Sequence, residues 1–264
     1  DAAWIFAKYD DGSGLWKHCF LDSTDNSHTA PAGSTIKIGT TKIGNNNQGM
    51  GAFIYSTNDT TVGTITWTNV KLRWNYGAQG VSDNAATLLK VFGVEMVYIP
   101  TGSFSAGDGA SAFKLQVCTG TSPNTYAPIN INNEDTLKFA TNIVGKAYYL
   151  SGGNVGETVS GTAFNVLPAF PKGYNAVYCM KYEISQKQYA DFLNCLTPVQ
   201  EANRYYTPAV ANVANGYYRY NIVGTQGNRI ANAPDRACNF LNWSDIAAYL
   251  DWSGLRPMTE LEFE

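Results

Sequence analysis

Residues 242–264, which read NWSDIAAYLDWSGLRPMTELEFE, carry the clearest folding signals of the chain. Asn242 or Ser244 is typical of a helix N-cap, and Gly254 is typical of the residue that ends a helix. Apolar residues at helical spacing lie between them, at Ile246, Tyr249 and Leu250. We therefore expect a helix that packs one face against a core.

A second helix start follows at Thr259, three residues before Glu262. In a capping box, the Thr hydroxyl accepts from the N3 amide while the Glu carboxylate accepts from the N-cap amide. Only residues 260–264 follow, which is too short a segment to recover the cost of nucleating a helix by itself. We expect the domain to continue beyond Glu264 in the natural protein.

Residues 1–93 consist of short apolar runs separated by turn residues. In the clearest run, Val70, Leu72 and Trp74 alternate with polar residues, which is the period of a strand with one buried face. Further runs occupy residues 4–10, 15–22, 34–39, 51–56, 63–69 and 87–100. Regular short strands with turns between them predict an antiparallel β-sandwich over residues 1–93.

A strand followed by a helix is predicted over residues 176–196. The run from 176 to 184 is apolar and extended, and Ser185 with Gln188 forms another capping box. Apolar residues then fall on one helix face, at Tyr189, Phe192, Leu193 and Leu196. We expect Pro198 to end this helix.

The composition excludes some classes of partner. Charged residues make up 15% of the chain, below the roughly 25% of an average soluble protein, and Tyr, Gly, Asn and Thr are abundant. A net charge of −3 without a basic run predicts no nucleic-acid partner. The sequence contains no apolar run long enough for a membrane span. A surface made polar by hydroxyl and amide groups favours an exported protein, extracellular or at a cell surface.

The cysteines and histidines predict neither a catalytic nor a metal-binding residue. The five cysteines, at 19, 118, 179, 195 and 238, contain no CxxC pair, so they are either small buried hydrophobic residues or include one disulfide. The two histidines, His18 and His28, both lie in the first half of the chain. We expect them to be ordinary strand or surface residues, and the sequence identifies no cofactor.

Four motifs in order resemble the formylglycine-generating-enzyme-like family, whose domain is a variant of the C-type lectin fold. The first motif is matched by Met96, Val97, Ile99, Pro100, Gly102 and Phe104. The second is matched by Lys181, Glu183, Ile184, Ser185, Tyr189, Phe192 and Asn194. The third and fourth are matched by residues 242–252 and 256–264.

The resemblance implies an α+β protein in two domains. Residues 94–264 would form an incomplete formylglycine-generating-enzyme-like domain with a C-type-lectin-type fold. This domain would follow the β-sandwich of residues 1–93 along the chain. In the family's oxidases, a cysteine pair in the C-terminal portion binds copper, and that portion would lie past Glu264. Relatives that use iron take histidine ligands from a separate helical domain.

We expect a non-catalytic, exported bacterial or phage-associated surface protein that recognises a ligand through the lectin-like domain. The candidate binding residues are Tyr205, Tyr206, Tyr217, Tyr218 and Tyr220. Tyrosine suits a recognition surface because it supplies contact area at low entropic cost, although the same residues also suit loop packing. The partner would be a protein or glycan ligand, or copies of the protein itself. The alternatives are a structural subunit of a surface layer, filament or virion, and a copper- or iron-dependent oxidase.

Overall fold

The computed structural model describes residues 1–58, 63–107, 115–120, 126–140, 143–149, 163–207 and 219–263. These residues form a β-rich structure with a few short helices, consistent with the α+β class that the sequence predicts. The chain divides into two compact units. Unit 1 comprises Asp1–Val97 and Met180–Pro257, and unit 2 comprises Tyr98–Cys179 and Met258–Glu264.

The compact units differ from the two domains that the sequence suggests. The boundary expected at residue 93 falls inside strand β5 (Leu88–Ile99). Residues 88–96 of β5 pair with β1 (Ala2–Asp10), and this pairing joins them to the N-terminal sheet. The segment expected to form one domain, 94–264, therefore contributes to both units.

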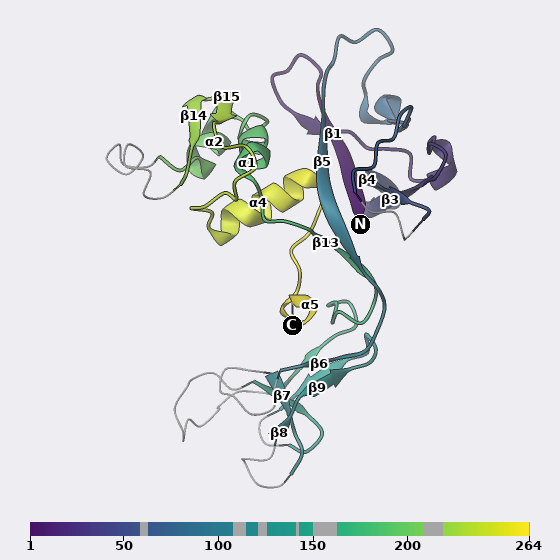
Figure 1. The fold of residues 1–264 in the computed structure, drawn as a ribbon, viewed down its shortest axis with the longest axis vertical. Helices are drawn as coiled ribbons and strands as arrows, with labels where there is room; N and C mark the ends of the chain where they lie inside the picture. Colours follow the sequence, from purple (N-terminus) through teal and green to yellow (C-terminus); the bar gives the residue numbers. More distant parts are fainter. Residues whose placement is uncertain are drawn as a thin grey trace. The chain divides into compact units, whose positions relative to one another are not determined.

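Unit 1 contains a six-stranded sheet in the order β13-β5-β1-β4-β3, with β2 paired to β1 as well (Figure 1). The other strands are β2 (Lys17–His18), β3 (Ser34–Ile43), β4 (Asn46–Ser56) and β13 (Val177–Met180). Among the described residues these strands form one curled sheet, so the predicted packing of two sheets over residues 1–93 is not seen. Alternating polarity shows that a strand buries one face, but it does not show what covers that face.

The clearest predicted strand, residues 70–76, is mostly irregular, and residues 63–69 are irregular as well. The backbone of residues 70–76 takes part in isolated bridges, at Lys71 and Trp74. Its apolar side chains nevertheless pack against a core of Leu21, Ile36, Ile38, Ala52 and Ile54. The alternation correctly identified the side chains that pack, partly buried, against the core, but it did not identify the backbone pairing.

Helix α4 (Trp243–Ser253) covers one face of the sheet in unit 1. Phe6 of β1 and Phe92 of β5 are cross-strand partners, and their ring centroids lie 5.0 and 4.7 Å from the Trp252 ring. The buried Trp4 indole N–H donates to the carbonyl oxygen of Ser253 at 2.8 Å. Aromatic packing and this hydrogen bond together fix the helix on the sheet.

Capping boxes start three helices of unit 1, as reciprocal bonds between each N-cap and N3 residue show. Ser185 caps α1 (Gln186–Leu193), which confirms the prediction, and Asn242 rather than Ser244 caps α4. Gly254 ends α4 in the left-handed conformation, with φ of 73°. Pro198 was predicted to end a helix, but it is the first residue of α2 (Pro198–Arg204). Proline suits this position because the missing N–H has no partner in the first turn.

Unit 2 contains a five-stranded sheet in the order β12-β10-β11-β7-β8 and a small two-stranded sheet, β6-β9. Their bounds are β6 (Phe104–Ala106), β7 (Leu115–Cys118), β8 (Tyr126–Ala127), β9 (Ile129–Ile131), β10 (Leu137–Phe139), β11 (Ala147–Tyr149) and β12 (Phe164–Val166). Helix α5 (Glu260–Phe263) adds Leu261 to the core. The predicted capping box at Thr259 is confirmed: its N–H donates to Glu262 Oε2 at 2.9 Å, and its Oγ1 accepts from Glu262 N at 3.1 Å.

A buried polar clasp holds the segment around Lys172 in unit 2. The Lys172 side chain is only 1% exposed, and its ammonium donates to the carbonyl oxygens of Glu134, Leu167 and Phe170. The Glu134 carboxylate in turn accepts from the backbone N–H groups of Lys172, Tyr174 and Asn175, at 2.6, 3.0 and 3.0 Å. A buried ammonium and a carboxylate thus satisfy the polar backbone of an irregular segment.

Candidate functional site

Three of the five predicted binding tyrosines come together in unit 1. The Tyr220 ring centroid lies 6.4 Å from that of Tyr205 and 5.7 Å from that of Tyr206. Tyr206 also stacks on Phe240, with 4.1 Å between the ring centroids. Tyr220 is buried, with 5% of its surface exposed. The remaining two predicted residues, Tyr217 and Tyr218, lie outside the described residues.

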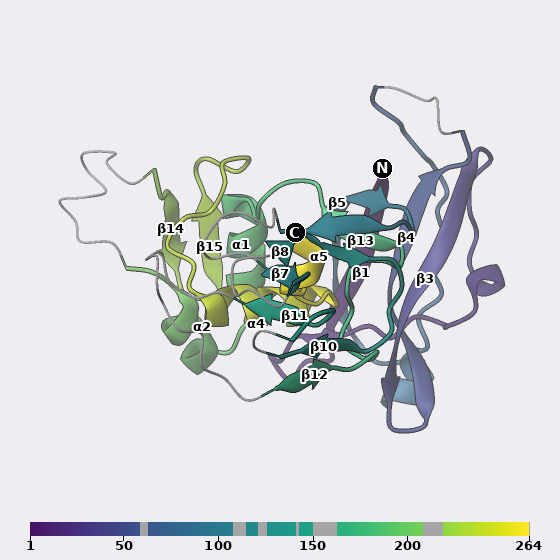
Figure 2. The same ribbon diagram turned by 90° about the horizontal axis from the view of Figure 1, so that it is seen from below.

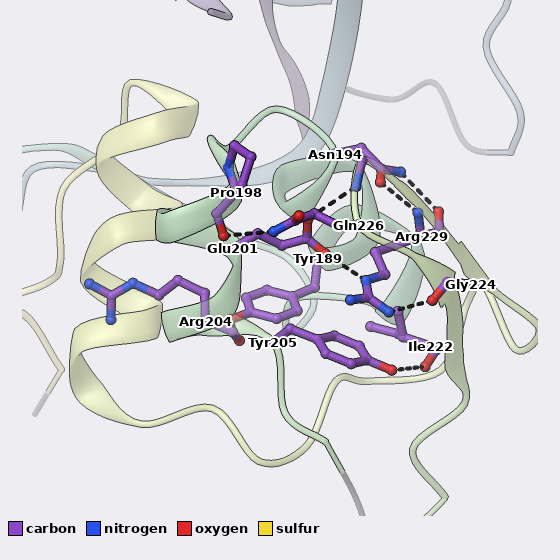
Figure 3. A network of polar contacts seen from close by, with 11 residues as sticks. Tyr189, Asn194, Pro198, Glu201, Arg204, Tyr205, Ile222, Gly224, Gln226 and Arg229 are labelled. Atoms are coloured by element: carbon purple, nitrogen blue, oxygen red, sulfur yellow. Dashed lines mark hydrogen bonds and ion pairs between the residues drawn. The ribbon is translucent and has the colours of Figure 1, made fainter.

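Tyr205 belongs to a network of polar contacts around Arg229 (Figure 3). Its hydroxyl donates to the carbonyl oxygen of Ile222 at 3.0 Å, and the Arg229 guanidinium lies 3.5 Å from the centre of its ring. The other side of the guanidinium meets Glu201, with 2.6 Å between Arg229 Nε and Glu201 Oε1. The Glu201 side chain is 1% exposed, so this ion pair is shielded from solvent.

The same network joins a hairpin to two helices. The hairpin consists of β14 (Ile222–Thr225) and β15 (Asn228–Ala231), beside α1 and α2 (Figure 2). Asn194, the C-cap of α1, accepts from the Arg229 backbone N–H at 2.6 Å and donates to its carbonyl at 2.9 Å. Glu201 of α2 accepts from the Gly227 N–H at 3.0 Å. These contacts favour a packing role for Tyr205 over a ligand-binding role.

A separate groove of about 690 Å³ lies in unit 1, between β5 and the N-terminal half of α1. Pockets that bind ligands typically have volumes of roughly 300–1,000 Å³. One wall is aromatic and comes from the sheet and α4: Phe6, Phe92, Tyr249 and Trp252. The other wall comes from the segment that leads from β13 into α1. That segment includes Tyr182, which is 60% exposed.

The rim of the groove is acidic. Its carboxylates are Glu95, Glu183, Asp191 and Asp235, and its lining contains one ammonium, that of Lys187. Lys187 pairs with Asp191 at 2.7 Å, and Lys181 pairs with Glu95 at 2.6 Å. Glu183 and Asp235 are exposed and add negative charge that these two pairs do not offset. An aromatic wall beside carboxylates suits a ligand that carries both an apolar and a cationic group.

Sequence reasoning missed a buried lysine behind the aromatic wall. Lys8 is 5% exposed, its Nζ lies 5.6 Å from the Trp252 ring centre, and it donates to His18 Nδ1 at 2.9 Å. His18 Nε2 in turn donates to the Met50 carbonyl oxygen at 2.6 Å. The strand pattern contained the signal, because Lys8 shares the sheet face of Trp4 and Phe6.

Burial shifts the pKa values of this pair downward. Desolvation lowers the pKa of Lys8 to about 8, although the nearby Cys195 and Asp251 oppose the shift. Desolvation and the positive charge of Lys8 lower the pKa of His18 to about 4. His18 is therefore neutral at pH 7, with its proton on Nε2. It lies in strand β2, as the sequence suggested, but the sequence did not reveal its contact with the buried Lys8.

No disulfide joins any of the cysteines, all of which lie among the described residues, so the disulfide alternative is wrong. Cys19, Cys118 and Cys195 are buried, as expected of small hydrophobic residues. Desolvation raises the pKa of Cys19 to about 12 and that of Cys195 to about 11, which disfavours the reactive thiolate. Within the described part of the chain, no three His, Cys, Asp or Glu side chains are placed to hold a metal ion together.

None of the helices in the described part of the chain is long and apolar enough to cross a membrane. Comparison with known proteins found no match among family models, curated proteins or solved structures. The resemblance to the formylglycine-generating-enzyme-like family, and the C-type-lectin-type arrangement that it implies, therefore remain predictions.

Proposed function

We propose that the protein is a non-catalytic recognition protein that binds its ligand in the groove between β5 and α1. The observation that carries the proposal is the combination of an aromatic wall with an acidic rim in one concave site. Ligand sites of proteins typically combine apolar walls with a few polar groups that orient the ligand. The ligand that fits best is a protein or glycan segment carrying a cationic group.

The proposal includes an extracellular or cell-surface location on a bacterium or phage. The low charged fraction, 15%, and the many Tyr, Gly, Asn and Thr residues support it. The resemblance of residues 94–264 to the formylglycine-generating-enzyme-like family supports a lectin-like scaffold as part of the proposal. Most of the predicted binding tyrosines that the structure describes are engaged in packing, so the proposal moves recognition from that cluster to the groove.

Peptide and glycan arrays probed with labelled protein test this function. Tyr182→Ala and Glu183→Gln change exposed side chains of the groove, so both variants are expected to fold. We expect each to weaken binding about tenfold, as the loss of an aromatic or charge-assisted contact does. The control is Trp243→Ala, because Trp243 is 67% exposed and lies outside the groove lining. Binding to neither array, or binding that all three variants leave intact, would argue against recognition by the groove.

A further inference from the structure

We propose that the groove takes an extended basic peptide, which adds as a strand to the outer edge of β5 over residues 91–93. The inference rests on the proposed function, that the groove binds a ligand, and specifies the class of ligand and the mode of binding. Strand addition to an exposed sheet edge derives affinity from backbone hydrogen bonds and specificity from alternate side chains.

The backbone of β5 shows which groups face outward. The Lys181 N–H donates to the Glu95 carbonyl oxygen at 2.9 Å, so this carbonyl points away from β1. The backbone groups of successive residues in a strand point to opposite sides. The N–H and C=O groups of Gly93 and Val91 therefore point outward as well, whereas those of Phe92 and Val94 point toward β1.

The outward groups of Val91 and Gly93 lie along the groove. β13 (Val177–Met180) lies beside β5 and ends before the chain turns into α1, and among the described strands none continues along β5 past this point. Residues 91–95 all line the groove. The Val91 side chain is 69% exposed, and Gly93 has no side chain to block the approach of another backbone. Among the residues that the structure describes, these outward groups have no backbone partner, and a row of such groups is a template for another strand.

The charge and apolarity of the groove define the peptide. Phe92 and Trp252 offer an aromatic wall to an apolar side chain. Glu183 and Asp235 lie on the opposite rim, and their carboxylates attract a Lys or Arg side chain. A peptide with alternating apolar and basic residues presents the two kinds of side chain on opposite faces of the added strand. An acidic peptide would meet like charge.

The test compares two substitutions at one position. Val91→Pro removes the outward N–H and is tolerated at a sheet edge, because that N–H does not bond to β1. Val91→Thr keeps both the N–H and the β-branched shape. Peptides selected from a random display library against the wild-type protein are measured by fluorescence anisotropy. We expect basic, alternating peptides to be enriched, Val91→Pro to weaken their binding about tenfold and Val91→Thr to leave it unchanged.

Backbone N-methylation of the selected peptides supplies a second readout. We expect loss of binding when alternate residues are methylated, because only every second N–H of an added strand faces β5. Circular dichroism and thermal melting establish that both variants fold. If Val91→Pro unfolds the protein, the methylation pattern alone tests whether the peptide adds as a strand to β5.

Three outcomes would overturn strand addition. Peptides that bind equally well to Val91→Pro and Val91→Thr, but lose affinity in Glu183→Gln, would leave groove recognition standing without an added strand. Glycan binding in the absence of peptide binding would do the same. A concentration-dependent dimer that Val91→Pro abolishes would assign the edge to a second copy of the chain. The proposed function itself fails only if no peptide or glycan binds the groove.

Discussion

The guanidinium of Arg229 lies between the buried carboxylate of Glu201 and the face of the Tyr205 ring, 2.6 Å from the first and 3.5 Å from the centre of the second. Glu201 lies in α2, Tyr205 directly follows this helix, and Arg229 lies in β15, so the contact joins the helix to the hairpin. A charge that is buried at this depth is tolerated only when it is paired and hydrogen-bonded.

Removing Arg229 is therefore expected to destabilise unit 1 strongly. Arg229→Ala leaves the Glu201 carboxylate buried without its partner, and breaking a buried pair in this way costs about 3 kcal/mol or more. Urea denaturation followed by circular dichroism measures the change. The matched control is Lys37→Ala, which breaks an exposed pair with Asp25 and should leave stability unchanged. Equal effects of the two substitutions would contradict a structural role for the Arg229 pair.

Acid is expected to weaken the protein partly through His18. Its pKa is about 4 in the folded chain and 6.5 in the unfolded chain, so between these values the unfolded state binds more protons. Stability from this group is complete above pH 6.5 and falls as the pH drops toward 4. The loss is roughly 2–3 kcal/mol, since His18 retains some exposure.

The measurement is the free energy of unfolding of the wild type and of His18→Gln across this pH range. The difference between the two curves should shrink as the pH falls, because glutamine has no proton to gain. A constant difference would contradict the sign of the shift. Lys8→Met should raise the pKa of His18, since the positive charge beside it is removed. NMR titration of the imidazole measures the pKa of His18 directly in the wild type and in Lys8→Met.

The N-cap of α4 can be tested against the alternative that the sequence allows. Asn242 Oδ1 accepts from the Asp245 N–H at 3.1 Å, whereas Ser244 lies inside the first turn. Asn242→Ala should cost about 1–2 kcal/mol, the usual range for loss of an N-cap. Ser244→Ala should cost less, because both contacts of its hydroxyl, with Asn242 Oδ1 and with the Arg204 guanidinium, are exposed. Thermal denaturation ranks the two, and the reverse order would reassign the cap.

The Lys172 clasp predicts a localised effect in unit 2. Lys172→Met fills the same space but leaves the carbonyl oxygens of Glu134, Leu167 and Phe170 without their donor. An unsatisfied buried polar group costs about 1–3 kcal/mol. Limited proteolysis should show faster cleavage near residues 163–175 in this variant. Lys138→Met is the control, and equal cleavage rates in the two variants would show that the clasp adds no stability.

Local signals in the sequence predicted local structure well. Interactions within a few residues produce the capping boxes at Ser185 and Thr259 and the left-handed Gly254, so the sequence predicts these features. Strand pairing depends on residues far apart. The alternation at Val70, Leu72 and Trp74 identified the side chains that pack against the core without revealing that their backbone lacks a regular partner.

The candidate site was harder to predict for the same reason. The groove joins β5, the segment entering α1, and α4, which lie between about residues 91 and 252 of the chain. No sequence motif predicts that these three elements come together. The tyrosine-rich composition pointed to residues 205–220, but composition cannot distinguish a ring that faces solvent from one packed under an arginine, as Tyr205 is.

The hydrogen bond from Trp4 to Ser253 joins residues 249 positions apart. At a synthesis rate of roughly 5–20 residues per second, the helix that covers this face of the sheet emerges from the ribosome tens of seconds after β1 does. Until then Trp4 and Phe6 have no α4 to cover them, and closing so long a loop slows folding. Production of the protein should therefore depend on chaperones that shield this face, more than its stability once folded would suggest.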